Sequence, residues 1–157
     1  MTHTLIAARA VAVAALLCMI TPTAAQAVQG GDIVQQTRVV IKQGEEQLAQ
    51  VRQQVRQENY SEAVRVLTQY RDAIKSAHAA LKATGRNAEK KPGGFKNLQI
   101  HLRHSIRQLD QLILSLPPDE RAPFDQVRKE LDSVDKELID ALFPRQPSKK
   151  GDTKPGP

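Results

Sequence analysis

Aromatic side chains are scarce in this chain of 157 residues, which contains two tyrosines, three phenylalanines and no tryptophan. Aromatic-rich β-sandwiches, and surfaces that stack on the bases of nucleic acids, both depend on many aromatic faces. The composition therefore excludes these two classes of protein. Hydrophobic residues make up 40% and charged residues 25%, and the length is that of one ordinary domain.

Cysteine is rarer still, since Cys18 is the only one. It lies within the first 27 residues, whose order is typical of a signal peptide: the basic Arg9, an apolar run over residues 10–20, and then small residues. The A-x-A pattern of residues 25–27 predicts cleavage before Val28, with a cut two residues earlier as the alternative.

Two other roles for this segment are alternatives to cleavage. A membrane anchor would need about 20 apolar residues to cross a bilayer as a helix, and the run has only about a dozen. A lipid-modified N-terminus would place a small residue before Cys18, where the chain has Leu16 and Leu17. We therefore predict that a bacterium exports this protein to its periplasm or secretes it.

Removal of the signal peptide would leave a mature chain with neither cysteine nor methionine, because Met1 and Met19 would leave together with Cys18. Such a chain has no disulfide, no cysteine-ligated zinc, no c-type haem attachment and no thiol catalysis.

Four segments between residues 28 and 144 carry apolar residues at the spacing that keeps one helix face against a neighbour. No segment alternates with period two over a useful length, so we predict an all-α fold. The four apolar stripes are Val34, Thr37, Ile41, Gly44, Leu48, Val51 and Val55; Tyr60, Ala63, Leu67, Tyr70, Ile74, Ala77 and Leu81; Phe95, Leu98, Leu102, Ile106, Leu109, Ile113 and Leu116; and Phe124, Val127, Leu131, Val134, Leu138, Ala141 and Leu142.

Helices of this length with short connections predict an antiparallel up-down four-helix bundle over residues 28–144. A long helical hairpin with the other two helices docked less tightly is the alternative. In the bundle, we expect Tyr60 and Phe124 to plug one end, and Phe95 and Phe143 to plug the other.

Two connections carry signals of helix boundaries. Gly85 follows the second stripe at the place where a C-terminal cap belongs. The fourth helix can start in two ways: Pro123 is a first-turn residue, or a short helical turn from Pro118 precedes the main helix.

No catalytic motif is present in the sequence. The chain lacks the G-x-S-x-G pattern of serine hydrolases and the glycine-lysine spacing of a phosphate-binding loop. Eight acidic residues crowd the fourth helical segment, where we expect a solvated face rather than a catalytic pair. We predict no enzyme activity and no cofactor.

Histidines provide the alternative function. The Glu-x-x-His motif of di-iron bundles is absent. His101 and His104 lie one turn apart, and His78 precedes the second connection by about the distance at which His101 follows it. Imidazoles with a carboxylate suit zinc or copper. The alternative is therefore a metal- or ligand-binding bundle that uses His78, His101, His104 and Glu137.

The formal net charge is +6, an excess that often indicates an anionic partner. In the antiparallel bundle, the connection after the second helix and the tail of residues 145–157 emerge at one end. The tail is rich in Pro, Lys and Gly, and we predict that it is disordered. This arrangement predicts a basic pole for phosphates or carboxylates, the alternative being two merely solvated segments. The residues of the pole are Arg86, Lys90, Lys91, Lys96, Arg145, Lys149, Lys150 and Lys154.

These features predict a non-enzymatic interaction or structural protein of the cell envelope, with no transmembrane segment after processing. Its partner would be an envelope protein or an anionic lipid or polysaccharide surface, because export removes cytoplasmic nucleic acid from reach. Eight glutamines between Ile33 and Gln57 give the first helix a neutral polar face. Such a face is compatible with coiled-coil pairing and a homo-oligomer.

Overall fold

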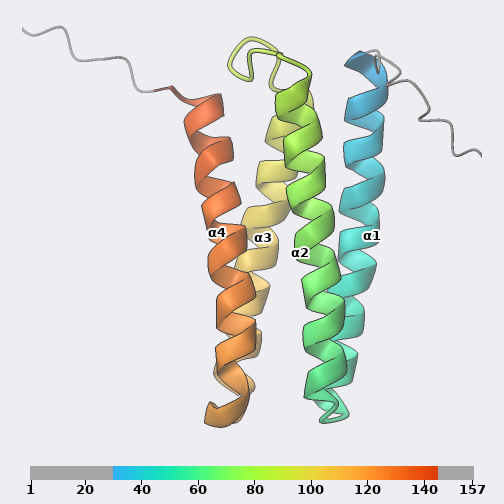
Figure 1. Ribbon diagram of the computed structural model, residues 1–157, viewed down its shortest axis with the longest axis vertical. Helices are drawn as coiled ribbons and strands as arrows, with labels where there is room; N and C mark the ends of the chain where they lie inside the picture. The colour runs from blue at the N-terminus through green and yellow to red at the C-terminus, as the bar shows by residue number, and fades with distance from the viewer. Residues whose placement is uncertain (1–29, 145–157) are drawn as a thin grey trace, which may run out of the picture.

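Four α-helices make up the protein in the computed structural model, which describes residues 30–144 (Figure 1). The predicted signal peptide and the predicted tail lie outside the described residues. No strand occurs between residues 30 and 144, so the all-α prediction is confirmed. The helices are α1 (Gly30–Arg56), α2 (Tyr60–Ala83), α3 (Gly93–Ser115) and α4 (Arg121–Leu142), with a 3-10 turn, η1 (Pro118–Glu120), before α4.

The apolar stripes read from the sequence form most of the core, whereas Ala141 of the fourth stripe is exposed. Every member of the α3 stripe is buried, and Tyr70 of α2 and Phe124 of α4 are fully buried. In α1 the stripe is the least deeply buried, since Val34, Ile41 and Val55 are only partly buried. Burial of these faces is the main favourable contribution to the fold, because it removes apolar area from water.

The contacts between helices do not simply follow their order along the chain. They are most extensive between α1 and α2 and between α3 and α4, followed by α1 with α3 and α2 with α4. By contrast, α2 and α3 touch little, although they are consecutive. Figure 1 shows the α2–α3 connection and the end of α4 at one end of the molecule, with the other two connections at the opposite end.

Both boundary signals are found in the structure. Gly85 has a φ of 63°, in the left-handed region that favours glycine, and its N–H donates to the Lys82 carbonyl at 3.1 Å. A 3-10 turn begins at Pro118, and Pro123 lies in the first turn of α4, where its missing N–H has no helical partner to lose.

The prediction that four aromatic side chains close the two ends of the bundle is correct for only three of them. Phe95 and Phe124 are buried and Tyr60 is partly buried, whereas Phe143 is 71% exposed, so its predicted place is wrong. The reason is that α4 ends at Leu142, and Phe143 adopts a non-helical backbone beyond the last turn. Buried Leu142 and Ala88 of the α2–α3 connection contribute apolar side chains to the core instead.

None of the helices between residues 30 and 144 has an apolar stretch of the length required to cross a membrane.

Candidate functional site

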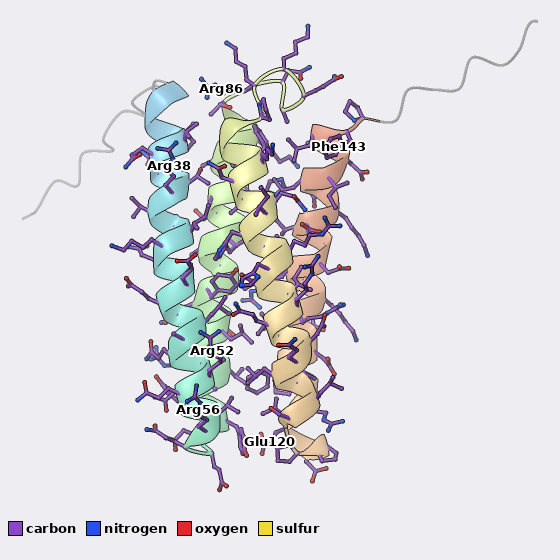
Figure 2. All side chains as sticks on the ribbon, turned by 180° about the vertical axis from the view of Figure 1, so that it is seen from behind. Arg38, Arg52, Arg56, Arg86, Glu120 and Phe143 are labelled. Carbon is purple, nitrogen blue, oxygen red and sulfur yellow. The ribbon has the colours of Figure 1, made fainter. Side chains whose placement is uncertain are left out.

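The α2–α3 connection presents four basic residues at one end of the molecule. Lys90, Lys91 and Lys96 are exposed, and Arg86 is partly buried. Figure 2 shows Arg86 at this end, beside side chains of the connection that project away from the helices. We call Arg86, Lys90, Lys91 and Lys96 the basic end.

Local hydrogen bonds and one apolar anchor hold the backbone of this connection. The Arg86 N–H donates to Thr84 Oγ1 at 3.3 Å, and the Lys90 N–H donates to Asn87 Oδ1 at 2.9 Å. The side chain of Ala88 is buried against the core. Side-chain oxygens of Thr and Asn are well suited to such turns. The basic side chains are therefore presented from a backbone that the fold positions.

No carboxylate among residues 30–144 forms an ion pair with any member of the basic end. The first turn of α3, which contains Lys96, also has no acidic residue. The partial positive charge of a helix N-terminus adds to that of the lysines. Glu89 of the same connection offsets one of the four cations without pairing with any of them, so this end keeps a net positive charge.

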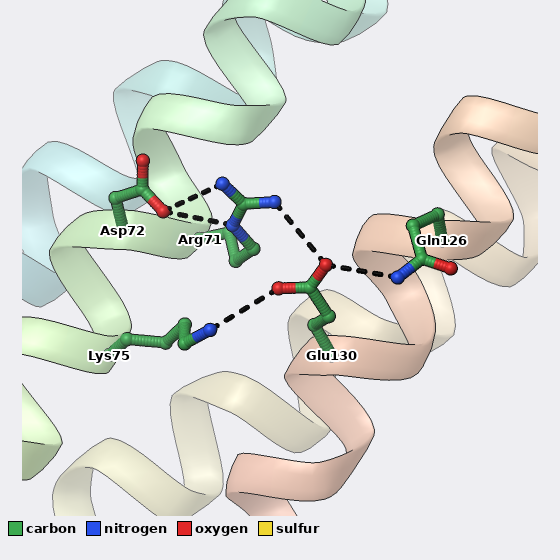
Figure 3. Close-up of polar contacts among 5 residues, drawn as sticks. All are labelled: Arg71, Asp72, Lys75, Gln126 and Glu130. Carbon is green, nitrogen blue, oxygen red and sulfur yellow. Dashed lines mark hydrogen bonds and ion pairs between the residues drawn. The ribbon is translucent and has the colours of Figure 1, made fainter.

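Some cations along the sides of the bundle do pair with carboxylates, as the seam between α2 and α4 shows (Figure 3). Glu130 accepts from Arg71 at 3.4 Å and from Lys75 at 3.3 Å, and Gln126 Nε2 donates to it at 3.1 Å. The bond from Gln126 is the main cause that lowers the Glu130 pKa, and both cations add to it. These contacts join the acidic α4 to α2 rather than form a binding site.

The predicted basic pole also included Arg145, Lys149, Lys150 and Lys154, which lie outside the described residues. Pro144, the last described residue, follows α4 at the end that carries the α2–α3 connection (Figure 1). The structure therefore places the four members of the basic end and the point from which the tail departs.

His78 lies in the seam between α2 and α4. Burial lowers its pKa, and the nearby Glu137 carboxylate partly offsets that effect. Glu137 accepts a hydrogen bond from Lys82 at 3.1 Å, which is the main cause of its own lowered pKa. His78 and Glu137 are thus neighbours, as the sequence suggested, but a lysine is bound to the carboxylate.

His101 lies in a different environment, among α1, α2 and α3. Its Nε2 is 3.1 Å from the Tyr70 hydroxyl, and the two rings meet edge to face with centroids 5.9 Å apart. Burial lowers the His101 pKa, with a smaller opposing effect from Glu45, so the ring is neutral at neutral pH. Because a neutral acceptor nitrogen faces Tyr70, we assign the Tyr70 hydroxyl as donor to Nε2.

Burial also raises the pKa of Tyr70, an effect that the nearby Ser105 hydroxyl partly offsets. The Ser105 hydroxyl donates to the His101 carbonyl at 2.9 Å and lies 3.5 Å from His101 Nε2. Each buried polar side chain of this cluster therefore has a partner. A protonated Tyr70 and a neutral His101 form a hydrogen-bonded pair inside the core, which stabilises the fold rather than activating a nucleophile.

The four predicted metal ligands do not form one cluster. His104 is exposed, and its Nε2 lies 2.6 Å from Gln108 Nε2. His78 faces α4 because α2 packs on α4 rather than on α3. Between residues 30 and 144, no three side chains of His, Cys, Asp or Glu are close enough to hold a metal ion.

A groove of about 410 Å³ between α1 and α3 was not predicted from the sequence. It brings His101 and His104 together with residues of α1, because α1 packs beside α3. The apolar pattern marks which face of each helix is buried but not which helices become neighbours, so the sequence carried no signal for it. The groove is lined by Arg38, Ile41, Glu45, Asn97, Ile100, His101 and His104.

No protein-family model matches the chain, and neither the curated proteins nor the solved structures contain a significant match.

Proposed function

We propose that this protein is an exported, non-enzymatic interaction protein of the cell envelope, an antiparallel up-down bundle that binds an anionic partner at its basic end. The observation that carries the proposal is the clustering of four cations within residues 86–96 at one end of the bundle. None of the four pairs with a carboxylate among the described residues.

Lipid phosphates are the partner chemistry that we favour for this end. Several lysines on one connection attract an anionic surface at about 1 kcal/mol for each cation near it. The four basic residues of the tail would add to the same surface, because the chain leaves α4 at this end.

The charge of the basic end can be removed without disturbing the core. We expect the triple variant Lys90→Gln, Lys91→Gln, Lys96→Gln to bind vesicles of phosphatidylglycerol and phosphatidylcholine at least about tenfold more weakly in co-sedimentation. Binding of the unchanged protein is expected to fall as salt is raised, because ions screen exposed charges.

A matched variant removes the same charge from the sides: Arg107→Gln, Lys129→Gln, Lys136→Gln, all exposed positions. It should retain most of the binding, because these residues lie on α3 and α4 away from the connection. Equal binding by both triple variants would contradict the proposal, as would binding that salt does not affect.

Export is tested by the mass of the protein recovered from the periplasm or medium of a bacterium that expresses the full chain. The expected mass is that of a chain beginning at Val28, without Cys18. A full-length mass in the membrane fraction, or a lipid attached to Cys18, would show that the segment is an anchor instead.

A further inference from the structure

Phe143 is an exposed aromatic side chain at the end of the molecule that carries the basic end. Its exposed fraction is 71%, whereas the other four aromatic side chains between residues 30 and 144 are buried or partly buried. Figure 2 shows Phe143 and Arg86 at the same end, with Glu120 at the opposite one. Single exposed apolar side chains are common on protein surfaces, so the position of Phe143 matters more than its exposure alone.

The fold holds the backbone of Phe143. Its N–H donates to the Ile139 carbonyl at 2.8 Å, and the preceding residue, Leu142, is buried in the core. Pro144 follows, and a proline disfavours the helical conformation in the residue before it. Phe143 accordingly has a φ of −132° and a ψ of 66°, and α4 ends one residue earlier. The aromatic side chain is therefore presented to solvent from a backbone with a defined position.

A buried hydrogen bond sets the level of Phe143 relative to α3. Gln99 Nε2 of α3 donates to Asp135 Oδ1 of α4 at 3.1 Å, and both side chains are buried. From Asp135 to its last residue α4 extends about 10 Å, and α3 begins about 9 Å before Gln99. Because α3 begins and α4 ends at the same end of the molecule (Figure 1), Phe143 lies level with the first turn of α3, which contains Lys96.

Cations outnumber carboxylates in the segments near Phe143. Besides the four members of the basic end, the four basic residues of the tail follow Pro144 in the chain, beginning with Arg145. Together they outnumber the carboxylates of the same segments and of the start of α1 by eight to four, which favours an anionic partner. These carboxylates are Asp32, Glu89, Asp140 and Asp152.

Leu114 provides a comparison at the opposite end of the molecule. It lies in the last turn of α3 and is 75% exposed, about as much as Phe143. The helix connections at that end, residues 56–62 and 118–121, carry four carboxylates and two cations. Three of the carboxylates, Glu58, Glu62 and Glu120, line one depression of the surface. Leu114 is therefore an exposed apolar side chain beside an excess of negative charge.

We propose that Phe143 inserts into the boundary between the headgroups and the acyl chains of an anionic bilayer, while the basic end binds the lipid phosphates. The inference rests on the proposed function, because it requires the basic end to meet a membrane. Peripheral proteins bind membranes through buried apolar area together with attraction to anionic lipids. An aromatic side chain supplies a large apolar area at a single residue. A soluble polyanion could bind the cations but would offer the aromatic ring no apolar phase.

Fluorescence tests the insertion, because the chain contains no tryptophan and an introduced one reports on its own surroundings. The emission of Phe143→Trp should shift to shorter wavelength when vesicles of phosphatidylglycerol and phosphatidylcholine are added. Lipids brominated in their acyl chains should quench it. Leu114→Trp should show neither change, because it lies at the opposite end. Inorganic polyphosphate, which has no apolar phase, should shift neither emission.

Removal of the ring tests its contribution to binding. We expect Phe143→Ser to bind the same vesicles at least about fivefold more weakly in co-sedimentation, because apolar burial is lost. The factor should be similar at low and high salt, since ions screen charges and not apolar contacts. Leu114→Ser, the matched control, should bind within about twofold of the unchanged protein, because an exposed substitution has little effect on the fold.

The outcomes separate the insertion from the proposed function. Salt-sensitive binding without a spectral shift in Phe143→Trp, or undiminished binding by Phe143→Ser, would overturn the insertion and leave the basic end as the binding site. Failure of the unchanged protein to bind vesicles would overturn both. A Phe143→Trp emission that is already at short wavelength without vesicles would show that the tail or a second copy covers this position, and would also overturn the insertion.

Discussion

Replacing Gly44 by valine is expected to lower the free energy of unfolding by about 3 kcal/mol, the upper end of the usual cost of overpacking a core. Gly44 lies in the middle of α1, at the point where this helix passes over Tyr70 and His101. A Cβ atom added there would be 2.7 Å from Tyr70 Cε2 and 3.0 Å from His101 Nε2. The first distance is shorter than real Cβ contacts, so a neighbour must move.

The neighbours of Gly44 have little freedom to move. Tyr70 has no exposed surface, and its hydroxyl is fixed by the hydrogen bond to His101. The gain of about 1 kcal/mol that an interior helix position usually obtains on losing glycine is therefore exceeded by the cost of displacing α1. Valine is a stronger test than alanine, because its branched side chain adds two methyl groups and favours helix less.

The matched control is Gly93→Ala, at the start of α3. A Cβ atom at Gly93 would be 3.8 Å from its nearest neighbour, Val34, which is ordinary contact. We expect this variant to unfold within about 0.5 kcal/mol of the original protein, as surface substitutions generally do. Urea titrations of both variants give the comparison. If Gly44→Val and Gly93→Ala unfold at the same urea concentration, α1 does not approach Tyr70 as described.

The buried face of each helix could be predicted from the sequence because burial imposes a period. The α3 stripe from Phe95 to Leu116 is the clearest case, since all of its members are buried. Gly85 was equally predictable, because few other residues accept a positive φ at a helix end. The position of Phe143 could not be predicted, because it depends on where α4 ends. A periodic apolar pattern does not determine the last residue of a helix.

A periodic apolar pattern does not predict which helices pack against one another. The expectation that His78 and His101 share a layer assumed that α2 packs on α3, whereas α2 packs on α1 and α4. The hydrogen bond between Tyr70 and His101 depends on the same choice of partners and had no signal in the sequence. The basic end was predictable in part, because Arg86, Lys90, Lys91 and Lys96 lie within a short stretch of the chain.

Replacing His101 by glutamine is expected to reduce the loss of stability that the protein shows between about pH 7 and pH 5. Burial is the main cause that lowers the pKa of His101 from its ordinary value of 6.5, and the nearby His104 lowers it further. Glu45 of α1 raises it slightly, and Tyr70 of α2 contributes a neutral hydroxyl. Inside the fold, the ring therefore takes up a proton only at a lower pH than it does in the unfolded chain.

The direction of the effect follows from proton binding. Well above pH 6.5 the ring is neutral in both states, and stability does not depend on it. As the pH falls toward this value and below it, the unfolded chain binds a proton first, so the free energy of unfolding decreases. The decrease stops below the folded pKa and amounts to about 1.4 kcal/mol for each unit by which the pKa is lowered. His78 acts in the same direction, because burial also lowers its pKa.

Urea unfolding from pH 5 to pH 8 measures these contributions, in a range above the titration of most carboxylates. Glutamine can still accept the Tyr70 hydrogen bond, so His101→Gln should retain most of the stability at pH 7.5. Its free energy of unfolding should fall less steeply toward pH 5. The double variant His78→Gln, His101→Gln should show a nearly flat pH profile. His104→Gln should flatten the profile only slightly, because His104 is a minor cause of the lowered His101 pKa and burial is the main one. An unchanged slope in His101→Gln, or a slope in His104→Gln as flat as that of His101→Gln, would mean that a group other than His101 carries the acid sensitivity.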